Sequence, residues 1–345
     1  TNYYIAQNHL KALIYFHLAQ LDSLRDIHDF MESDSDLNEL INPVSLGSLS
    51  NYNNNINFEV YIPLLNQIIA TAMNQLSIDH KIKEFGSVKI IDSSTVSMAL
   101  SYFKWAEFRK TKAGIKLHTK YDLGKGVPEL VIVSNAKVHD KKKMEELMTE
   151  KNCIYVVDKA YVDYKKFDKF TDDGKYFITR LKDNAVTEEV ETLKITYSQM
   201  ELLDEDTTIV YDKVVYLGNE YINKTKKKYR IIKIIDAKGK ELIFVTNVFH
   251  LSSEEIAWLY KKRWEIELFF KWIKQHLKIK KFIGYSLNAV MNQIITAIIA
   301  FIMIKMVQKI AKSSLGLLKI KRLIKHSITK HVDNRTFNWA IWLGS

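Results

Sequence analysis

The chain has 345 residues, of which 47% are hydrophobic and 26% charged, and it carries a formal net charge of +11. This composition excludes a disordered chain, and the length allows two or three structural units. The charge predicts a polyanionic partner, which the total alone leaves open as nucleic acid or an anionic membrane.

The basic charge is concentrated in the last quarter of the chain. Residues 260–345 hold 17 lysines and arginines against three acidic residues, so the remainder is slightly acidic. Cys153 is the single cysteine, which excludes an intramolecular disulfide and fits a reducing compartment. Residues 1–20 lack the basic start and long apolar run of a signal peptide. We therefore expect a cytoplasmic protein.

The first 84 residues are expected to form a helical N-terminal domain. Apolar residues recur at helical spacing through residues 10–31, and a second helix is predicted at about residues 58–76 after an Asn-rich turn. Several short helices of this kind suit either a DNA-binding module or a helical cap, and both interpretations stay open.

From residue 88 the pattern changes to short β-type runs. Strands are predicted at 88–92, 115–121, 130–134, 154–158 and 176–179, with helices at about 140–149 and 164–170. The first three strands suggest an antiparallel meander. The order of three strands, helix, strand, helix and strand matches the ribonuclease-H-like α/β layout, in which a mixed sheet carries helices on its faces.

The rest of the chain returns first to strands and then to helices. A β-rich insertion is predicted at 183–250, followed by one long helix from Ser252 to about Leu277 and another at about 286–309. The apolar run 294–304 is too short to span a bilayer and is interpreted as part of a buried helix. We expect a catalytic domain formed by residues 85–182 and 251–312, and a basic C-terminal tail at 313–345.

Two aspartates stand out because each follows an apolar strand. Asp92 comes after the run 88–91, and Asp158 after the run 154–157. A carboxylate at the end of a buried strand is costly to desolvate unless it binds a cation or accepts hydrogen bonds. If the strands are neighbours, the two carboxylates converge on an all-oxygen site suited to Mg²⁺ or Mn²⁺. The alternative is that each aspartate only caps the turn that follows it.

The long helix carries four functional groups at a helical spacing. At about 100° per residue, Tyr260, Arg263, Glu267 and Lys274 share one face. An adjacent apolar arc is able to bury against a sheet, which would place the glutamate at the edge of the core beside two cations suited to phosphate. The alternative is an ordinary solvated ion pair between Glu267 and Lys271.

These residues resemble the DDE transposases of bacterial insertion sequences, specifically the insertion sequence 4 family with its Tyr-Arg-Glu-Lys signature. The signature spacing of two, three and six intervening residues fits Tyr260, Arg263, Glu267 and Lys274 without a gap. The segments 91–95, 114–122, 158–161 and 177–184 are similar to the other family motifs. Lys159 stands where many relatives carry arginine, so the charge is kept but a bidentate contact is lost.

The resemblance implies a ribonuclease-H-like catalytic core interrupted by the β-rich insertion. It implies that Asp92, Asp158 and Glu267 are the catalytic residues and hold Mg²⁺, with Mn²⁺ as a substitute. It further implies that Tyr260, Arg263 and Lys274 bind DNA near the cleavage point. The expected partners are the double-stranded DNA of transposon ends and target, with a homodimer on DNA and no membrane, in the bacterial cytoplasm.

The expected function is cut-and-paste transposition, meaning metal-dependent cleavage at transposon ends followed by strand transfer into target DNA. Two alternatives remain at this stage. One is a metal-dependent nuclease of the same fold that cleaves without joining. The other is a DNA-binding protein derived from a transposase that has lost catalysis, against which the presence of all three carboxylates argues.

Overall fold

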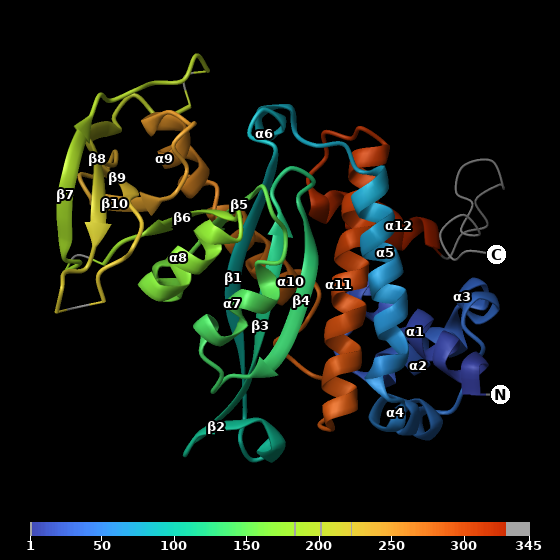
Figure 1. Ribbon diagram of the computed structural model, residues 1–345. Helices are drawn as coiled ribbons and strands as arrows, with labels where there is room; N and C mark the ends of the chain where they lie inside the picture. Colours follow the sequence, from blue (N-terminus) through green and yellow to red (C-terminus); the bar gives the residue numbers. More distant parts are fainter. Residues whose placement is uncertain (1, 183, 201, 222, 329–345) are drawn as a thin grey trace. The chain divides into compact units, whose positions relative to one another are not determined.

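The computed structural model describes residues 2–182, 184–200, 202–221 and 223–328, which form two compact units. The first unit contains the described residues up to Leu76, residues 96–114 and those from Phe270 onward. The second contains residues 77–95 and 115–269. Each unit is described by itself below, with elements labelled as in Figure 1.

The first unit is helical, as the sequence predicts for the N-terminal residues. Its elements are α1 (Asn2–Ala19), α2 (Leu24–Ser33), α3 (Ser35–Leu40), α4 (Leu46–Asn55), η1 (Phe58–Tyr61), α5 (Ile62–Gln75), η2 (Lys104–Ala106), β2 (Glu107–Arg109), α11 (Leu287–Ile310) and α12 (Leu317–Ile328).

The α11 helix is the centre of this first unit. By length and composition it is apolar enough to cross a membrane, yet 78% of its most apolar window is buried. The helices α1, α4 and α5 pack against it (Figure 1). The prediction of a buried helix for the run 294–304 is therefore confirmed. Within the predicted basic tail from residue 313, residues 317–328 form α12, and residues 329–345 lie outside the described part of the chain.

The second unit is built around a mixed sheet. Its elements are α6 (His80–Lys83), most of β1 (Ser87–Met98) and β3 (Lys112–Asp122), β4 (Val127–Asn135), α7 (Asp140–Leu147), β5 (Cys153–Val157), η3 (Lys159–Tyr161), α8 (Tyr164–Asp172), β6 (Tyr176–Arg180), β7 (Thr187–Leu193), β8 (Thr208–Leu217), β9 (Tyr229–Ile235), β10 (Glu241–Thr246), α9 (Ser253–Lys261) and the start of α10 (Trp264–His276).

The sheet order explains how distant segments meet. The strands run β2-β3-β1-β5-β6-β10-β9-β8-β7, with β4 paired to β3. The β1–β5 and β5–β6 ladders are parallel, whereas β3–β4, β6–β10 and the ladders beyond are antiparallel. The predicted strand and helix order from residue 88 to residue 180 is confirmed. The strands of the β-rich segment continue the same sheet through β10.

The helices α7 and α8 pack on this sheet through an aromatic and aliphatic core (Figure 1). Met144 and Leu147 of α7 and Phe167 of α8 are fully buried, as is Cys153 at the start of β5. Burial raises the pKa of the Cys153 thiol to about 11, which suits the small buried hydrophobe that a lone cysteine beside an apolar run predicts. This packing supports the segment of β1 that pairs with β5, from Ser87 to Ile91.

The single long helix predicted from Ser252 to Leu277 is wrong. The structure has two helices, because α9 ends at Lys261 and α10 begins at Trp264. At the junction the Arg263 N–H donates to the Tyr260 carbonyl and the Glu265 N–H to the Lys262 carbonyl, each at 3.0 Å, which are the three-residue bonds of a tight turn. The turn contains neither glycine nor proline, so the sequence carries no local signal for it.

Candidate active site

Asp92 and Asp158 lie next to each other at one end of the parallel β1–β5 ladder. The last registered pair of that ladder is Ile91 with Val157, and each aspartate is the next residue along the chain. The expectation that Asp92 ends its strand is wrong, because β1 continues to Met98. The pairing of β1 with β5 ends before Asp92, and both carboxylates therefore lie just beyond the end of this ladder.

Arg263 connects the first aspartate to the glutamate of α10. Its guanidinium donates to Asp92 Oδ2 at 2.7 Å and also donates to Glu267 Oε1. The Glu267 side chain therefore turns toward the strand pair. The side chains of Arg263, Asp92 and Glu267 are 15%, 17% and 33% exposed, so the ion pairs lie at the edge of the core, where they are screened less than surface pairs.

The electrostatics of the site show an excess of negative charge. Burial raises the pKa of Asp92 to about 6, the Arg263 charge and the Ser93 N–H oppose this rise, and the charges of Asp158 and Glu267 add to it. Burial alone would lower the pKa of Arg263, but the charge of Asp92 and the hydrogen bond and charge of Glu267 raise it. Two carboxylates thus share one guanidinium, and the charge of Asp158 acts on Asp92, which leaves a site that attracts cations.

Asp158 also performs the simpler role that the sequence left open. One of its oxygens accepts the Ala160 N–H at 2.9 Å and caps η3. A carboxylate has several lone-pair positions, so this single bond leaves capacity for a further ligand. The turn cap fixes the side chain beside Asp92 rather than replacing a role in the site.

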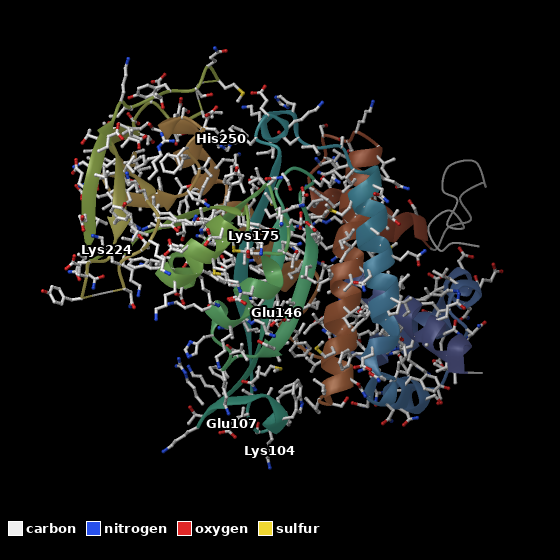
Figure 2. All side chains as sticks on the ribbon, viewed as in Figure 1. Lys104, Glu107, Glu146, Lys175, Lys224 and His250 are labelled. Carbon is white, nitrogen blue, oxygen red and sulfur yellow. The ribbon has the colours of Figure 1, made fainter. Side chains whose placement is uncertain are left out.

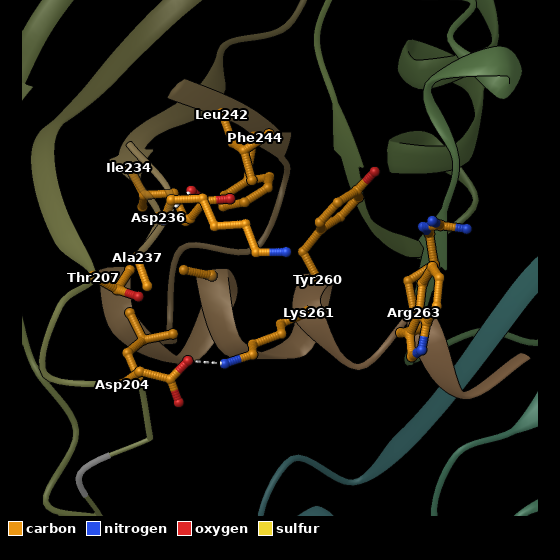
Figure 3. Close-up of a pocket in the computed structure, with 14 residues that line it drawn as sticks. Asp204, Thr207, Ile234, Asp236, Ala237, Leu242, Phe244, Tyr260, Lys261 and Arg263 are labelled. Atoms are coloured by element: carbon orange, nitrogen blue, oxygen red, sulfur yellow. Dashed lines mark hydrogen bonds and ion pairs between the residues drawn. The ribbon is translucent and has the colours of Figure 1, made fainter. Parts of the chain in front are cut away.

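Tyr260 lies on the last turn of α9 and lines a cavity of about 340 Å³ between α9 and the β9–β10 hairpin. Its ring packs on Phe244 with centroids 4.7 Å apart, and burial raises its pKa to about 12. Figure 3 shows the Tyr260 and Arg263 side chains extending from neighbouring positions of the chain, while Lys261 turns away to pair with Asp204. Tyr260 and Arg263 thus share one wall, together with the 57% exposed Trp264.

Lys274 is the one signature residue that belongs to the first unit. It lies in the last turn of α10, where burial and the nearby charge of Lys280 lower its pKa. Because the chain turns between α9 and α10, the predicted face of four residues on one helix is divided. Tyr260 belongs to α9, Arg263 lies in the turn, and Glu267 and Lys274 lie two turns apart on α10.

The carboxylates of Asp92, Asp158 and Glu267 are suitable ligands for hard divalent cations, although their oxygen atoms do not converge on one point. Among the described residues, the one group of three potential ligands whose atoms all lie within 4.8 Å is His28, Asp29 and Glu32 on α2. Asp92 and Glu267 instead lie on either side of the Arg263 guanidinium. Three oxygen donors with a net negative charge are the chemistry that Mg²⁺ and Mn²⁺ prefer.

A basic groove lies on the same unit, beside the loop that follows Asp158. Its volume is about 590 Å³, and Lys141, Lys165 and Lys182 line it. Within the described residues no carboxylate lies within ion-pair distance of these three amines. Lysines of the β-rich segment differ, since Lys224, labelled in Figure 2, pairs with Glu188 at 2.5 Å.

Sequence reasoning missed a polar group directly behind Asp92. Ser93 donates its hydroxyl to Asp140 at 2.7 Å, and Asp140 also accepts from Lys116 at 3.2 Å. Asp140 begins α7 and was interpreted only as part of a polar helix. Its position after a strand, at the same end of the sheet as the two catalytic candidates, is the signal that could have identified it.

The model of the family described as transposase DDE domain matches residues 83–303. The chain belongs to this family. The resemblance to DDE transposases of insertion sequences is therefore confirmed, and members of the DDE transposase family generally depend on divalent metal ions.

Two relatives of this DDE transposase family member come from bacteria. A probable transposase for insertion sequence element IS5377 of Geobacillus stearothermophilus is 32% identical over 63% of this chain and 56% of its own length. A putative transposase for insertion sequence element IS4SA of Synechocystis is 27% identical over 71% of this chain and 68% of its own length. The chain thus spans little more than half of the first of these relatives.

The fold also has a solved counterpart. The piggyBac transposase, determined as a synaptic complex with hairpin DNA, aligns with a TM-score of 0.51 over 95% of this chain and 71% of that chain. The sequence identity is 10%, so this likeness concerns the fold alone. It agrees with the mixed α/β architecture of the DDE transposase domain described above.

Proposed function

We propose that this protein is a DNA transposase that cleaves DNA at transposon ends and transfers the cut strand into target DNA. The observation that carries the proposal is the arrangement of Asp92, Asp158 and Glu267: the first two follow one ladder, and the third is linked to Asp92 through Arg263. Family membership supports it, because the match covers all three residues.

We infer that Asp92, Asp158 and Glu267 hold divalent cations, with Mg²⁺ as the preferred ion and Mn²⁺ as a substitute. When bound, the ions would supply a low-pKa water as nucleophile and stabilise the leaving 3′ oxygen of an in-line phosphoryl transfer. The protein side chains orient this chemistry, since β1, β5 and α10 fix the three carboxylates from different directions. A liberated 3′ hydroxyl can then act as nucleophile in strand transfer at the same site.

Arg263 has two roles in this proposal. Without other cations its guanidinium pairs with both Asp92 and Glu267. Once cations occupy the carboxylates, the guanidinium is free to bind a DNA phosphate, for which its planar set of donors is well suited. Tyr260 on the same cavity wall adds a hydroxyl donor, and Lys274 is assigned to backbone contact by the family signature.

The DNA is held mainly through its phosphates. The basic groove of Lys141, Lys165 and Lys182 offers three cations without carboxylate partners among the described residues. The helix α12 adds Lys319, Arg322 and Lys325 on the first unit. Such contacts are independent of DNA sequence and weaken as salt rises. We infer a homodimer on DNA, because each transposon end requires its own cleavage site.

The strand order supports a finer description of the fold. The order β4, β3, β1, β5 and β6, with β3–β4 antiparallel and β1–β5 and β5–β6 parallel, is the one expected of a ribonuclease-H-like core. We propose that residues 85–182 and 251–312 form this catalytic domain, with the insertion at 183–250. Residues 1–84 form the helical N-terminal domain, and their direct contact with DNA remains a proposal.

The proposal is tested with labelled DNA carrying the element ends and a target plasmid, in the presence of Mg²⁺. We expect the wild type to produce cleaved ends and joined products, and Glu267→Gln to lose both by at least about 10³-fold while DNA binding is kept. Cleavage without joining would identify a nuclease. DNA binding without cleavage or metal uptake would identify an inactive transposase-derived protein.

A further inference from the structure

The hydrogen bonds behind Asp92 form a chain that leads away from the candidate metal site. Ser93 is used twice: its backbone N–H donates to Asp92 Oδ1 at 2.7 Å, and its hydroxyl donates to Asp140 Oδ1 at 2.7 Å. Successive side chains of a strand leave opposite faces. Ser93 therefore connects the Asp92 carboxylate to a group on the other face of β1.

This connection occurs where β1 loses one of its neighbours. The β1–β5 ladder ends at the Ile91–Val157 pair, two residues before Ser93. The backbone that orients Asp92 is thus no longer fixed by that ladder. The hydrogen bond from the Ser93 hydroxyl to Asp140 supplies an anchor at this point of the strand.

Asp140 is itself held firmly. It begins α7, whose Met144 and Leu147 are fully buried in the core of the second unit. Its carboxylate accepts from Lys116 Nζ at 3.2 Å, and the same amine donates to the Val138 carbonyl at 3.0 Å. The ring of His118 faces the carboxylate at 3.5 Å. The anchor therefore joins a helix start, strand β3 and the loop between β4 and α7.

We propose that Asp140 is a positioning residue for the metal ligand Asp92 and acts on it through Ser93. The inference rests on the proposed function for its relevance to catalysis. The hydroxyl of Ser93 fixes the backbone of β1 beyond the ladder, and the Ser93 N–H then restrains the Asp92 carboxylate. Partners of this kind, one step removed from the metal, set the orientation of a ligand, and their loss typically costs 10–100-fold in metal affinity or activity.

The test compares Asp140→Asn, Ser93→Ala and Ser93→Thr with the wild type. The first substitution keeps the size of the side chain but removes its charge, the second removes the hydroxyl, and the third keeps a hydroxyl in the same place. Glu145→Gln is the matched control, since it removes one negative charge from the same helix, at an exposed side chain that pairs with Lys166 and Lys169.

Two readouts are measured: Mn²⁺ affinity by isothermal titration of the full chain, and the Mn²⁺ concentration that gives half-maximal cleavage of end DNA. We expect Asp140→Asn and Ser93→Ala to weaken both by about 10–100-fold with unchanged DNA affinity. Ser93→Thr and Glu145→Gln are expected to stay within about threefold of the wild type, because the first keeps the hydroxyl and the second lies outside the chain of hydrogen bonds.

Unchanged Mn²⁺ affinity in folded Ser93→Ala would overturn the proposal, as would an equal loss in Glu145→Gln. If Asp140→Asn fails to fold, Ser93→Ala carries the test, because it removes a single oxygen from a partly exposed residue. Wild type that binds Mn²⁺ but does not cleave DNA would refute the proposed function instead, and the titration would still decide the role of Asp140.

Discussion

Two arginine–aspartate pairs in the second unit differ in how completely their hydrogen bonds are used. Asp212 of β8 is fully buried and accepts from Arg230 Nε at 2.9 and 3.0 Å and from the Ser253 hydroxyl at 2.6 Å. Arg230 also donates to the Leu251 carbonyl at 2.6 Å. This pair is neutral and saturated, and it ties β8 and β9 to the start of α9.

The group around the pair of Arg263 and Asp92 carries excess negative charge and unused hydrogen-bond acceptors. Asp158 and Glu267 add two further carboxylates, and the side chains of Asp92 and Glu267 are partly exposed. An ion pair whose hydrogen bonds are all formed holds elements together. Excess carboxylates at a solvent-accessible edge instead favour the binding of a cation. The difference separates a structural pair from a functional one although both use the same residue types.

The largest effect is expected when each arginine is removed in turn. Arg230→Met should lower the free energy of unfolding by about 3–5 kcal/mol, because it leaves a fully buried carboxylate unpaired. Arg263→Met should lower the free energy of unfolding by less, and Mg²⁺ should restore the lost stability. A cation can replace the guanidinium only at the solvent-accessible site. Denaturant unfolding with and without Mg²⁺ measures both. Equal rescue of the two variants would remove the distinction.

A smaller effect is expected from the metal ion itself. At a Mg²⁺ concentration of one hundred times its dissociation constant, a single native-state site stabilises a protein by about 2.7 kcal/mol. Wild type should show this rise in thermal unfolding, and chelation should abolish it. Glu267→Gln should show little of it, while Asp212→Asn, though less stable, should keep the full increment. A metal-independent melting curve in wild type would contradict the assignment of the site.

The smallest effect extends the comparison to a saturated group in the first unit. His17 is buried, its Nδ1 lies 2.8 Å from the Leu277 carbonyl oxygen, and burial lowers its pKa to about 3. The unfolded chain, with a histidine pKa near 6.5, takes up the proton first, so the stabilisation is present above that pH and is lost as the pH falls.

The loss for His17 should approach about 1.4 kcal/mol per pH unit below pH 6.5. Thermal unfolding of wild type and His17→Gln between pH 7.5 and 5 measures it. The variant is expected to show a shallower dependence on pH, whatever its absolute stability. Parallel curves would show that His17 does not contribute to the acid sensitivity.

The sequence predicted the carboxylates better than the arrangement that joins them. Asp92 and Asp158 were recognisable because each follows an apolar run, and strand pairing then places them together. The contact of Arg263 with Asp92 was not predictable, because it depends on a turn between α9 and α10 that a continuous hydrophobic pattern hides. Asp140 was missed since a polar helix start is common, and its significance arises only from the hydroxyl of Ser93.

The burial of α11 has a practical consequence for anyone who trims the chain to the segment that matches the family. The family match begins at residue 83, whereas α1, α4 and α5, which cover α11, precede it. A fragment started there would leave Thr296 without the His17 ring and Ile304 without Leu18, both of α1. Such a fragment would expose an apolar helix face with the hydropathy of a membrane-spanning segment. We expect it to aggregate or to bind lipid.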